Sequence, residues 1–122
     1  MPTVAVVEDN ADNRLLLQAL LGDRFDLLEF ENGADALAGF ESIKPDLVLL
    51  DISLPGMDGN EILRRIRAND NLKTVPVVAL TAHAMAGDRE RFLAAGFDDY
   101  VTKPITDENI LFRAVERLVP KR

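Results

Sequence analysis

The sequence predicts an α/β domain in which a five-stranded parallel sheet carries helices on both faces, a doubly wound arrangement. Short apolar runs alternate with segments of helical periodicity five times along the 122 residues. Each right-handed crossover between parallel strands must pack its helix on the sheet. Two of the runs, 46–50 and 75–80, are apolar apart from Asp46 at the start of the first, as expected for central strands that are covered on both faces.

The predicted strands are apolar or β-branched runs that end at polar residues. The first stops at Glu8, and the second has the weakest apolar character, which suits a strand at the edge of the sheet. Pro76 is acceptable in the fourth because it stands at the beginning of that run. In chain order, the strands are predicted at 3–7, 26–30, 46–50, 75–80 and 99–101.

The predicted helices end or begin at residues that are typical of helix termini. Gly22 ends the first helix and Gly96 the fourth. Thr106 is expected as the N-cap of the last helix, and the two acidic residues after it are favourable in a first turn. The other helices are predicted at 11–22, 34–42, 60–68 and 85–95.

Composition excludes several classes of function. The chain is 48% hydrophobic and 29% charged, so it can bury a core, and its net charge of −7 argues against a general binder of nucleic acid or anionic membranes. It contains no cysteine, which excludes disulfides and thiolate chemistry. We see no leader pattern and no apolar run near the roughly 20 residues that span a bilayer. We therefore expect one cytoplasmic domain over 1–122 with no output domain, since four residues follow Leu118.

Polar and ionisable residues stand where the predicted strands end. They are Glu8, Asp9, Asp51, Thr81 and Lys103. Each has an ordinary interpretation by itself: Asp9 or Asn10 could cap the following helix, and Lys103 could be a solvated loop residue. Those interpretations do not explain why all of them lie at the carboxyl edge, where open parallel sheets bind ligands.

This set of residue types favours phosphoryl transfer. Three neighbouring carboxylates repel one another unless a cation joins them, and Mg²⁺ is usually held by one or two carboxylates with water and a phosphate. The metal and a lysine can neutralise charge on a transferring phosphoryl group. A carboxylate can itself accept that group as an acyl phosphate, and Asp51, at the end of a central strand, is the best candidate.

Four blocks of sequence, in this order and at these separations, resemble the receiver domain of two-component response regulators. They are 6–10 (VVEDN), 46–59 (DLVLLDISLPGMDG), 76–82 (PVVALTA) and 95–104 (AGFDDYVTKP). The resemblance covers about 3–118 and is nearest in pattern to single-domain cell-cycle-type regulators and hybrid-kinase receivers. It implies the flavodoxin-like receiver fold with strand order 2-1-3-4-5.

The resemblance also implies roles for the acidic residues. Asp51 would accept a phosphoryl group from a phosphohistidine on a sensor histidine kinase or a histidine phosphotransfer protein. Asp9, Asp51 and the backbone carbonyl of Ser53 would bind Mg²⁺ directly, and Glu8 would act through water. Glu8 stands where this family often has aspartate.

Further roles follow from the same resemblance. Thr81 and Lys103 would contact the phosphoryl oxygens, and Tyr100 would be an aromatic switch that turns inward as Thr81 moves. The peptide bond after Lys103 is expected to be cis. The side chains of Ser53 and His83 would tune the lifetime of the acyl phosphate.

The first predicted helix has a broad apolar face and one leucine apart from it. At 100° per residue, the face that can pack on the sheet contains Asn13, Leu16, Leu17, Leu20 and Leu21. Leu15 lies nearly opposite. Because receivers typically dock their kinases on this helix, we hypothesise that Leu15 and Ala11 contact the phosphodonor.

The expected partners are proteins. A downstream target would dock on the face formed by the fourth helix, fifth strand and fifth helix, or the chain would pass its phosphate onward in a relay; a monomer or weak homodimer is expected. Neither nucleic acid nor a membrane is an expected partner. Arg64, Arg65 and Arg67 are interpreted as a solvated face of the third helix.

Alternative functions make different demands on the sequence. A flavin or nucleotide binder would need a Gly/Ser/Thr-rich phosphate cradle after the first strand, where this chain has the acidic segment 8–12. The chain could instead be a phosphorelay intermediate, an excised receiver of a hybrid histidine kinase, or a degenerate receiver that acts as a constitutive interaction module. It is not expected to be an enzyme beyond catalysing its own phosphorylation and dephosphorylation.

Overall fold

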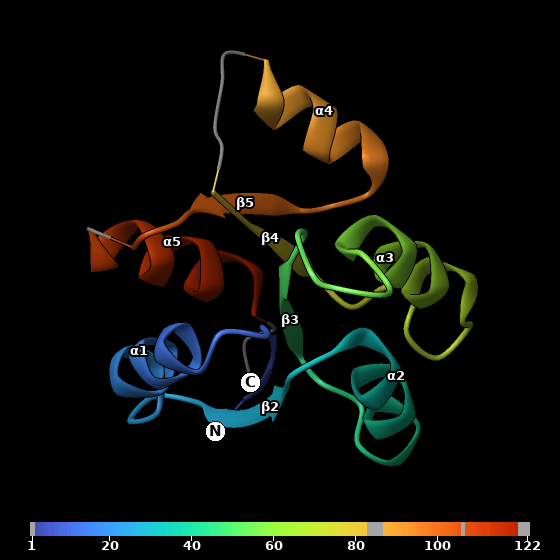
Figure 1. Ribbon diagram of the computed structural model, residues 1–122, viewed down its shortest axis with the longest axis horizontal. Helices are drawn as coiled ribbons and strands as arrows, with labels where there is room; N and C mark the ends of the chain where they lie inside the picture. Colours follow the sequence, from blue (N-terminus) through green and yellow to red (C-terminus); the bar gives the residue numbers. More distant parts are fainter. Residues whose placement is uncertain (1, 83–86, 106, 120–122) are drawn as a thin grey trace.

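Five parallel strands form one sheet in the order β2-β1-β3-β4-β5 (Figure 1). The computed structural model describes residues 2–82, 87–105 and 107–119. The strands are β1 (Thr3–Val7), β2 (Asp26–Phe30), β3 (Leu47–Asp51), β4 (Val77–Thr81) and β5 (Asp99–Thr102). The predicted fold and strand order are therefore confirmed.

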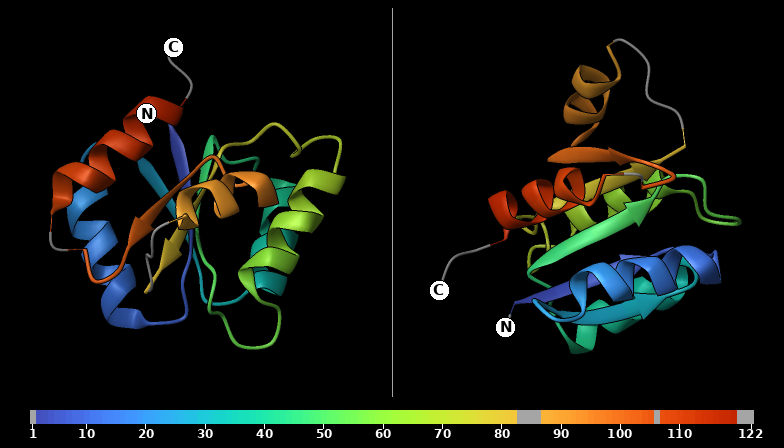
Figure 2. Two further views of the ribbon diagram at one scale, coloured as in Figure 1. Left: turned by 90° about the horizontal axis from the view of Figure 1, so that it is seen from above. Right: turned by 90° about the vertical axis from the view of Figure 1, so that its left-hand side faces the viewer.

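Helices cover both faces of this sheet. They are α1 (Ala11–Leu21), α2 (Gly33–Ser42), α3 (Gly59–Ala68), α4 (Asp88–Ala95) and α5 (Glu108–Leu118). Helices α1 and α5 lie on one face and α2 and α3 on the other, while Figure 2 shows α4 beside β5 at the sheet edge. In the part of the chain that the structure describes, no helix is long and apolar enough to cross a bilayer.

The central strand β3 explains why a continuous apolar run is needed. Leu47 and Leu49 pack into the core beneath α1 and α5, whereas Val48 and Leu50 pack into the core beneath α2 and α3. Successive side chains of a strand point to opposite faces, so a strand covered on both sides needs apolar residues at every position.

Several predicted boundaries differ from the structure, most of them by one or two residues and the start of α4 by three, since that helix was predicted from 85 and begins at Asp88. Strand β3 includes Asp51, because the next residue still donates its N–H to the carbonyl of Leu80 at 3.2 Å. Strand β4 begins at Val77, after Pro76, which has no N–H to donate. The N-cap of α5 is Asp107, whose carboxylate accepts the N–H of Asn109 at 3.0 Å; Thr106 lies outside the described residues.

The inward face of α1 is narrower than predicted. Leu17 and Leu21 are fully buried, but Leu16 is 37% exposed. Arg14, three residues before Leu17 and so on the same side of the helix, contacts the end of β1. Leu16 therefore joins Leu15, which is 64% exposed, on the outer surface of the helix.

Arg67 is not part of a solvated basic patch. Its side chain is 26% exposed and forms an ion pair with Asp98 at 2.9 Å. Its guanidinium also donates to backbone carbonyls of Lys73, Val75 and Gly96. Arg67 thus ties the end of α3 to the segments that lead into β4 and β5, whereas Arg64 and Arg65 are exposed as expected.

Candidate functional site

The sheet register brings the acidic residues together. Val7 of β1 pairs with Leu50 of β3, so the next residues along the two strands are Glu8 and Asp51. Asp9 follows Glu8. One carboxylate oxygen from each of these three acids lies within 4.8 Å of the other two.

The three acids differ in their exposure to solvent. Glu8 is 0% exposed and Asp51 is 2% exposed, while Asp9 is exposed. Thr81, at the end of neighbouring β4, is also buried. The cluster therefore has two buried carboxylates and one that faces solvent at its mouth.

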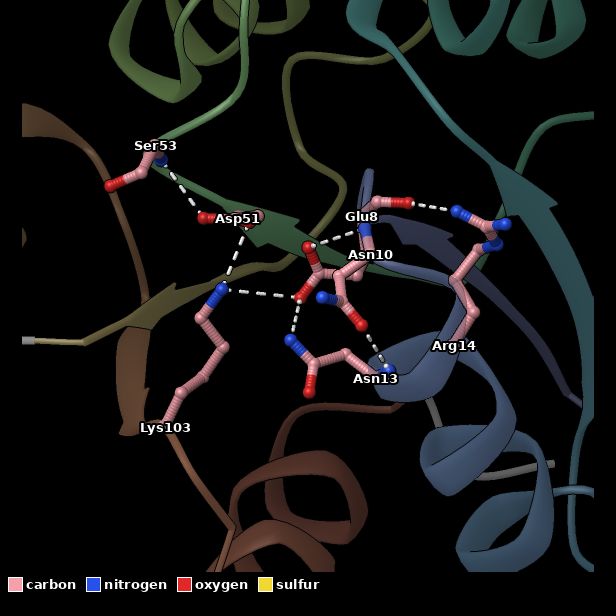
Figure 3. A network of polar contacts seen from close by, with 7 residues as sticks. All are labelled: Glu8, Asn10, Asn13, Arg14, Asp51, Ser53 and Lys103. Atoms are coloured by element: carbon pink, nitrogen blue, oxygen red, sulfur yellow. Dashed lines mark hydrogen bonds and ion pairs between the residues drawn. The ribbon is translucent and has the colours of Figure 1, made fainter.

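Lys103 supplies the opposite charge (Figure 3). Its Nζ lies 2.9 Å from Asp51 Oδ2 and 3.2 Å from Glu8 Oε1. Thr81 pairs with Thr102 in the ladder, and the N–H of Lys103 donates to the Thr81 carbonyl at 2.7 Å, so the register of β5 places the lysine beside the acids. The peptide bond after Lys103 is cis, as the resemblance implies.

The remaining oxygen of Asp51 is also held. The N–H of Ser53 donates to Asp51 Oδ1 at 2.9 Å. Each carboxylate oxygen of Asp51 therefore has a donor, one a backbone amide and the other the lysine ammonium. Ser53 lies beside the site, and its carbonyl remains a predicted metal ligand.

The first turn of α1 fixes Glu8 from the other side. Asn13 Nδ2 donates to Glu8 Oε1 at 3.0 Å, and Arg14 Nη1 donates to the Glu8 carbonyl at 2.8 Å. The sequence interpretation missed both contacts. The one feature of the sequence that could have indicated them is that Asn13 and Arg14 stand in the first turn of the helix that follows β1. Asn10, and not Asp9, caps α1, since its Oδ1 accepts the N–H of Asn13 at 3.0 Å.

The crowded carboxylates shift one another's proton affinity. Burial raises the pKa of Glu8 to about 7, helped by its hydrogen-bonded contact with Asp51 and by the charge of Asp51, and opposed by Lys103. Burial also acts to raise the pKa of Asp51, but hydrogen bonds with Glu8, the Ser53 N–H and Lys103 outweigh it and leave that pKa below its usual value. Glu8 is therefore the carboxyl group that takes up a proton near neutral pH.

The donor set fits a hard divalent cation. Three carboxylates offer only oxygen ligands, one of them from the solvent side, which is the chemistry that Mg²⁺ prefers. A cation at this position would relieve the repulsion from Asp51, which adds to the effect of burial on the pKa of Glu8. The residues present thus suit the predicted ion.

Other predicted residues lie outside this cluster. Tyr100 of β5 is half-buried, and its ring packs on Phe92 of α4 with a centroid separation of 5.3 Å. Ala11 and Leu15 are exposed on α1. His83 falls outside the described residues, and the switching and rate-tuning roles stay predictions.

The sequence matches the response regulator receiver domain over residues 4–115. The chain belongs to this family. It is 38% identical over 105 residues to the polar-differentiation response regulator DivK of Brucella anthropi, covering 85% of each chain. It is 42% identical over 113 residues to the sensor protein GacS of Pseudomonas syringae, covering 89% of this chain but only 12% of GacS.

A solved structure agrees with this assignment. The receiver domain of the sensor histidine kinase PA1611 from Pseudomonas aeruginosa superposes with a TM-score of 0.85 and 36% identity, covering 96% of both chains. That receiver has a magnesium ion coordinated in its active-site cleft. The predicted family is therefore confirmed, and the chain is a receiver domain of two-component signalling.

The raised pKa of Glu8 predicts a pH dependence of stability. The folded carboxyl group keeps its proton up to about pH 7, whereas an unfolded glutamate releases it near 4.5, so a rise in pH through this window favours the unfolded chain. In EDTA, the free energy of unfolding from urea titrations should fall between about pH 5 and pH 7.5. Glu8→Gln should remove this fall.

The exposed glutamate Glu41 provides the matched control for that experiment. Glu41→Gln should keep the wild-type pH profile. If Glu8→Gln loses as much stability over the same window as the wild-type protein, another group is responsible and the proposed crowding at Glu8 is wrong.

Proposed function

We propose that this receiver accepts a phosphoryl group on Asp51 from a phosphohistidine of a histidine kinase or histidine phosphotransfer protein. A carboxylate oxygen of Asp51 attacks phosphorus, the bond between phosphorus and the histidine nitrogen breaks, and its electron pair returns to the imidazole. The observation that carries this proposal is the buried Asp51 carboxylate, held by Ser53 N–H and Lys103 beside two further acids.

Mg²⁺ is part of the proposal. Glu8, Asp9 and Asp51, with the Ser53 carbonyl, would hold the ion, which supplies charge neutralisation to the phosphoryl oxygens. The donor chemistry of the cluster supports this, as does the magnesium in the PA1611 receiver. The protein's own contribution is to keep Asp51 ionised and oriented, which its lowered pKa and two donors favour.

Lys103 and Thr81 would respond to the added charge. Phosphorylation adds about −1.5 to −2 charges, which attract the ammonium of Lys103 and the hydroxyl of Thr81 at the end of β4. Tyr100 lies on the neighbouring strand β5, where it pairs with Ala79 of β4. Its ring packs on Phe92 of α4, so a movement of Thr81 in β4 could displace α4 through Tyr100. This proximity supports the proposed aromatic switch.

The proposed output face joins α4, β5 and α5. Its described residues border a groove of about 1100 Å³ that includes Tyr100 and Ile110. Asp99 ties the face together, since it forms ion pairs with Arg89 of α4 and Arg117 of α5. A change at Tyr100 would therefore act on a surface whose three elements are already linked.

The proposed phosphoryl transfer is compatible with two organisations of the whole protein. The chain would act alone if it resembles DivK in organisation, or as one part of a longer kinase or relay if it resembles GacS. The convergence of Asp51, Lys103 and the other acids favours an active receiver over a degenerate interaction module. A cytoplasmic location belongs to this proposal and accords with the absence of cysteine. A monomeric or weakly dimeric state, and catalysis only of the chain's own phosphorylation and dephosphorylation, belong to it as well.

Asp51→Asn should abolish phosphorylation by acetyl phosphate in the presence of Mg²⁺, because the amide is not a nucleophile for phosphoryl transfer. Intact-protein mass spectrometry measures the added phosphoryl group. Asp70→Asn is the matched control, since the Asp70 side chain is 95% exposed and belongs to α3–β4 connecting residues outside the site. Full labelling of Asp51→Asn would move the acceptor elsewhere.

The exposed leucines of α1 support the proposed docking of the phosphodonor there. Leu15 and Leu16 are 64% and 37% exposed, on the helix whose first turn contacts Glu8. An apolar surface on the helix that contacts Glu8 suits a partner that must bring a phosphohistidine to Asp51. Ala11, exposed in the same helix, extends this surface toward the site.

Leu15→Asp should slow transfer from the phosphorylated donor protein by about tenfold or more, because it places a charge in an apolar contact. Labelling by acetyl phosphate, which needs no docking, should stay at the wild-type rate. Ile43→Asp is the control, since Ile43 is 52% exposed after the end of α2. Unchanged transfer to Leu15→Asp would exclude this contact.

A further inference from the structure

We propose that Asn13 is a positioning residue that holds the Glu8 carboxylate in place for the metal ion. This inference rests on the Mg²⁺ site of the proposed function and extends it to a residue outside the three acids. It stems from the way in which Glu8 is held: a fully buried carboxylate bonded by the first turn of the following helix.

The two oxygens of Glu8 have unequal donors (Figure 3). Oε1 accepts from Asn13 Nδ2 at 3.0 Å and from Lys103 Nζ at 3.2 Å. Oε2 faces the N–H of Asn10 at 3.4 Å, near the limit of a hydrogen bond. The stronger donors thus share one oxygen, which leaves the other as the better acceptor for an ion or its bound water.

The side-chain amide of Asn13 is suited to positioning Glu8 because it is neutral and because the backbone of Asn13 is itself held in place. It donates a hydrogen bond without adding a positive charge, so it orients Glu8 without competing with a cation. Its own backbone N–H is held by the N-cap Asn10 at 3.0 Å, and the neighbouring Arg14 bonds the Glu8 carbonyl at 2.8 Å. Backbone and side chain of Glu8 are therefore both fixed by one helical turn.

The contact depends on the length of the glutamate side chain. Asp at this position would lack one methylene and withdraw the carboxylate by about 1.5 Å. A separation of 3.0 Å would then exceed hydrogen-bonding range. Asn13 should accordingly matter when residue 8 is glutamate and lose its effect when residue 8 is aspartate.

A double-mutant cycle in the full chain tests this dependence. Mg²⁺ dissociation constants are measured by isothermal titration calorimetry at pH 7.5 for wild type, Asn13→Ala, Glu8→Asp and the double variant. Asn13→Ala should weaken binding about tenfold, as is common when a group that orients a ligand is removed. In the Glu8→Asp background, the same substitution should change affinity less than about twofold.

Two further variants serve as a confirmation and a control. Asn13→Met keeps the bulk of the side chain but donates nothing, so it should reproduce the loss even if Asn13→Ala folds poorly. Gln18→Ala, an exposed position of the same helix, should bind like wild type. Thermal melts in EDTA check that each protein is folded, and a residue with only a structural role would change these melts and leave the Mg²⁺ affinity unchanged.

The outcomes separate this inference from the function on which it rests. Wild-type protein that does not bind Mg²⁺ overturns the proposed metal site and the role of Asn13 with it. Wild-type binding with unchanged affinity in Asn13→Ala and Asn13→Met overturns only the role of Asn13. An equal loss in the Glu8 and Glu8→Asp backgrounds also overturns it, because Asn13 would then act through another group.

Discussion

Crowding of negative charge at the carboxyl edge of the sheet is the constraint on which the site depends. Parallel pairing of β1 with β3 sets Glu8 beside Asp51, and neither is exposed by more than 2%. Two unit charges 4.8 Å apart repel by about 3.5 kcal/mol at an effective dielectric constant near 20. Since whole domains are stable by only about 5–15 kcal/mol, this repulsion must be offset locally.

The protein offsets it with a lysine, a proton and hydrogen-bond donors. Lys103 lies between the two buried acids, and the raised pKa of Glu8 allows one of them to be neutral near pH 7. A cation would replace the proton, and a phosphoryl group would draw Lys103 away from Glu8. Under the proposed reaction, the same groups that stabilise the ion-free fold would respond to each ligand, and chemistry at Asp51 would be coupled to the contacts of β5.

Much of this could be predicted from the sequence because the deciding signals are local. Apolar runs mark β3 and β4, and the residues at strand ends mark the site, since a parallel sheet gathers those ends at one edge. Strand order has no such local signal; the resemblance to receivers implies it, and the fold confirms it. Asp51 lies within one residue of the predicted strand end, which is the usual uncertainty of a boundary.

The errors concern contacts between distant segments. Leu16 fits the apolar stripe of α1, yet it is 37% exposed in the structure, because the side of the helix that meets the sheet depends on contacts with other segments that periodicity cannot reveal. Arg67 looks like its exposed neighbour Arg64, but its acceptors come from the segments before β4 and β5. Asn13 likewise gains its significance only from the end of β1. Each depends on how packed elements meet, and not on the local pattern.

Thermal unfolding with Mg²⁺ or with EDTA tests most directly whether the three acids share a cation. Mg²⁺ at about ten times its dissociation constant should stabilise the folded chain by about 1.4 kcal/mol, which corresponds to a rise in Tm of about 5 °C for a domain of this size. Asp9→Asn, which removes the solvent-facing acid, should require more Mg²⁺ for the same rise. A wild-type Tm that is the same in EDTA and in millimolar Mg²⁺ would contradict the account.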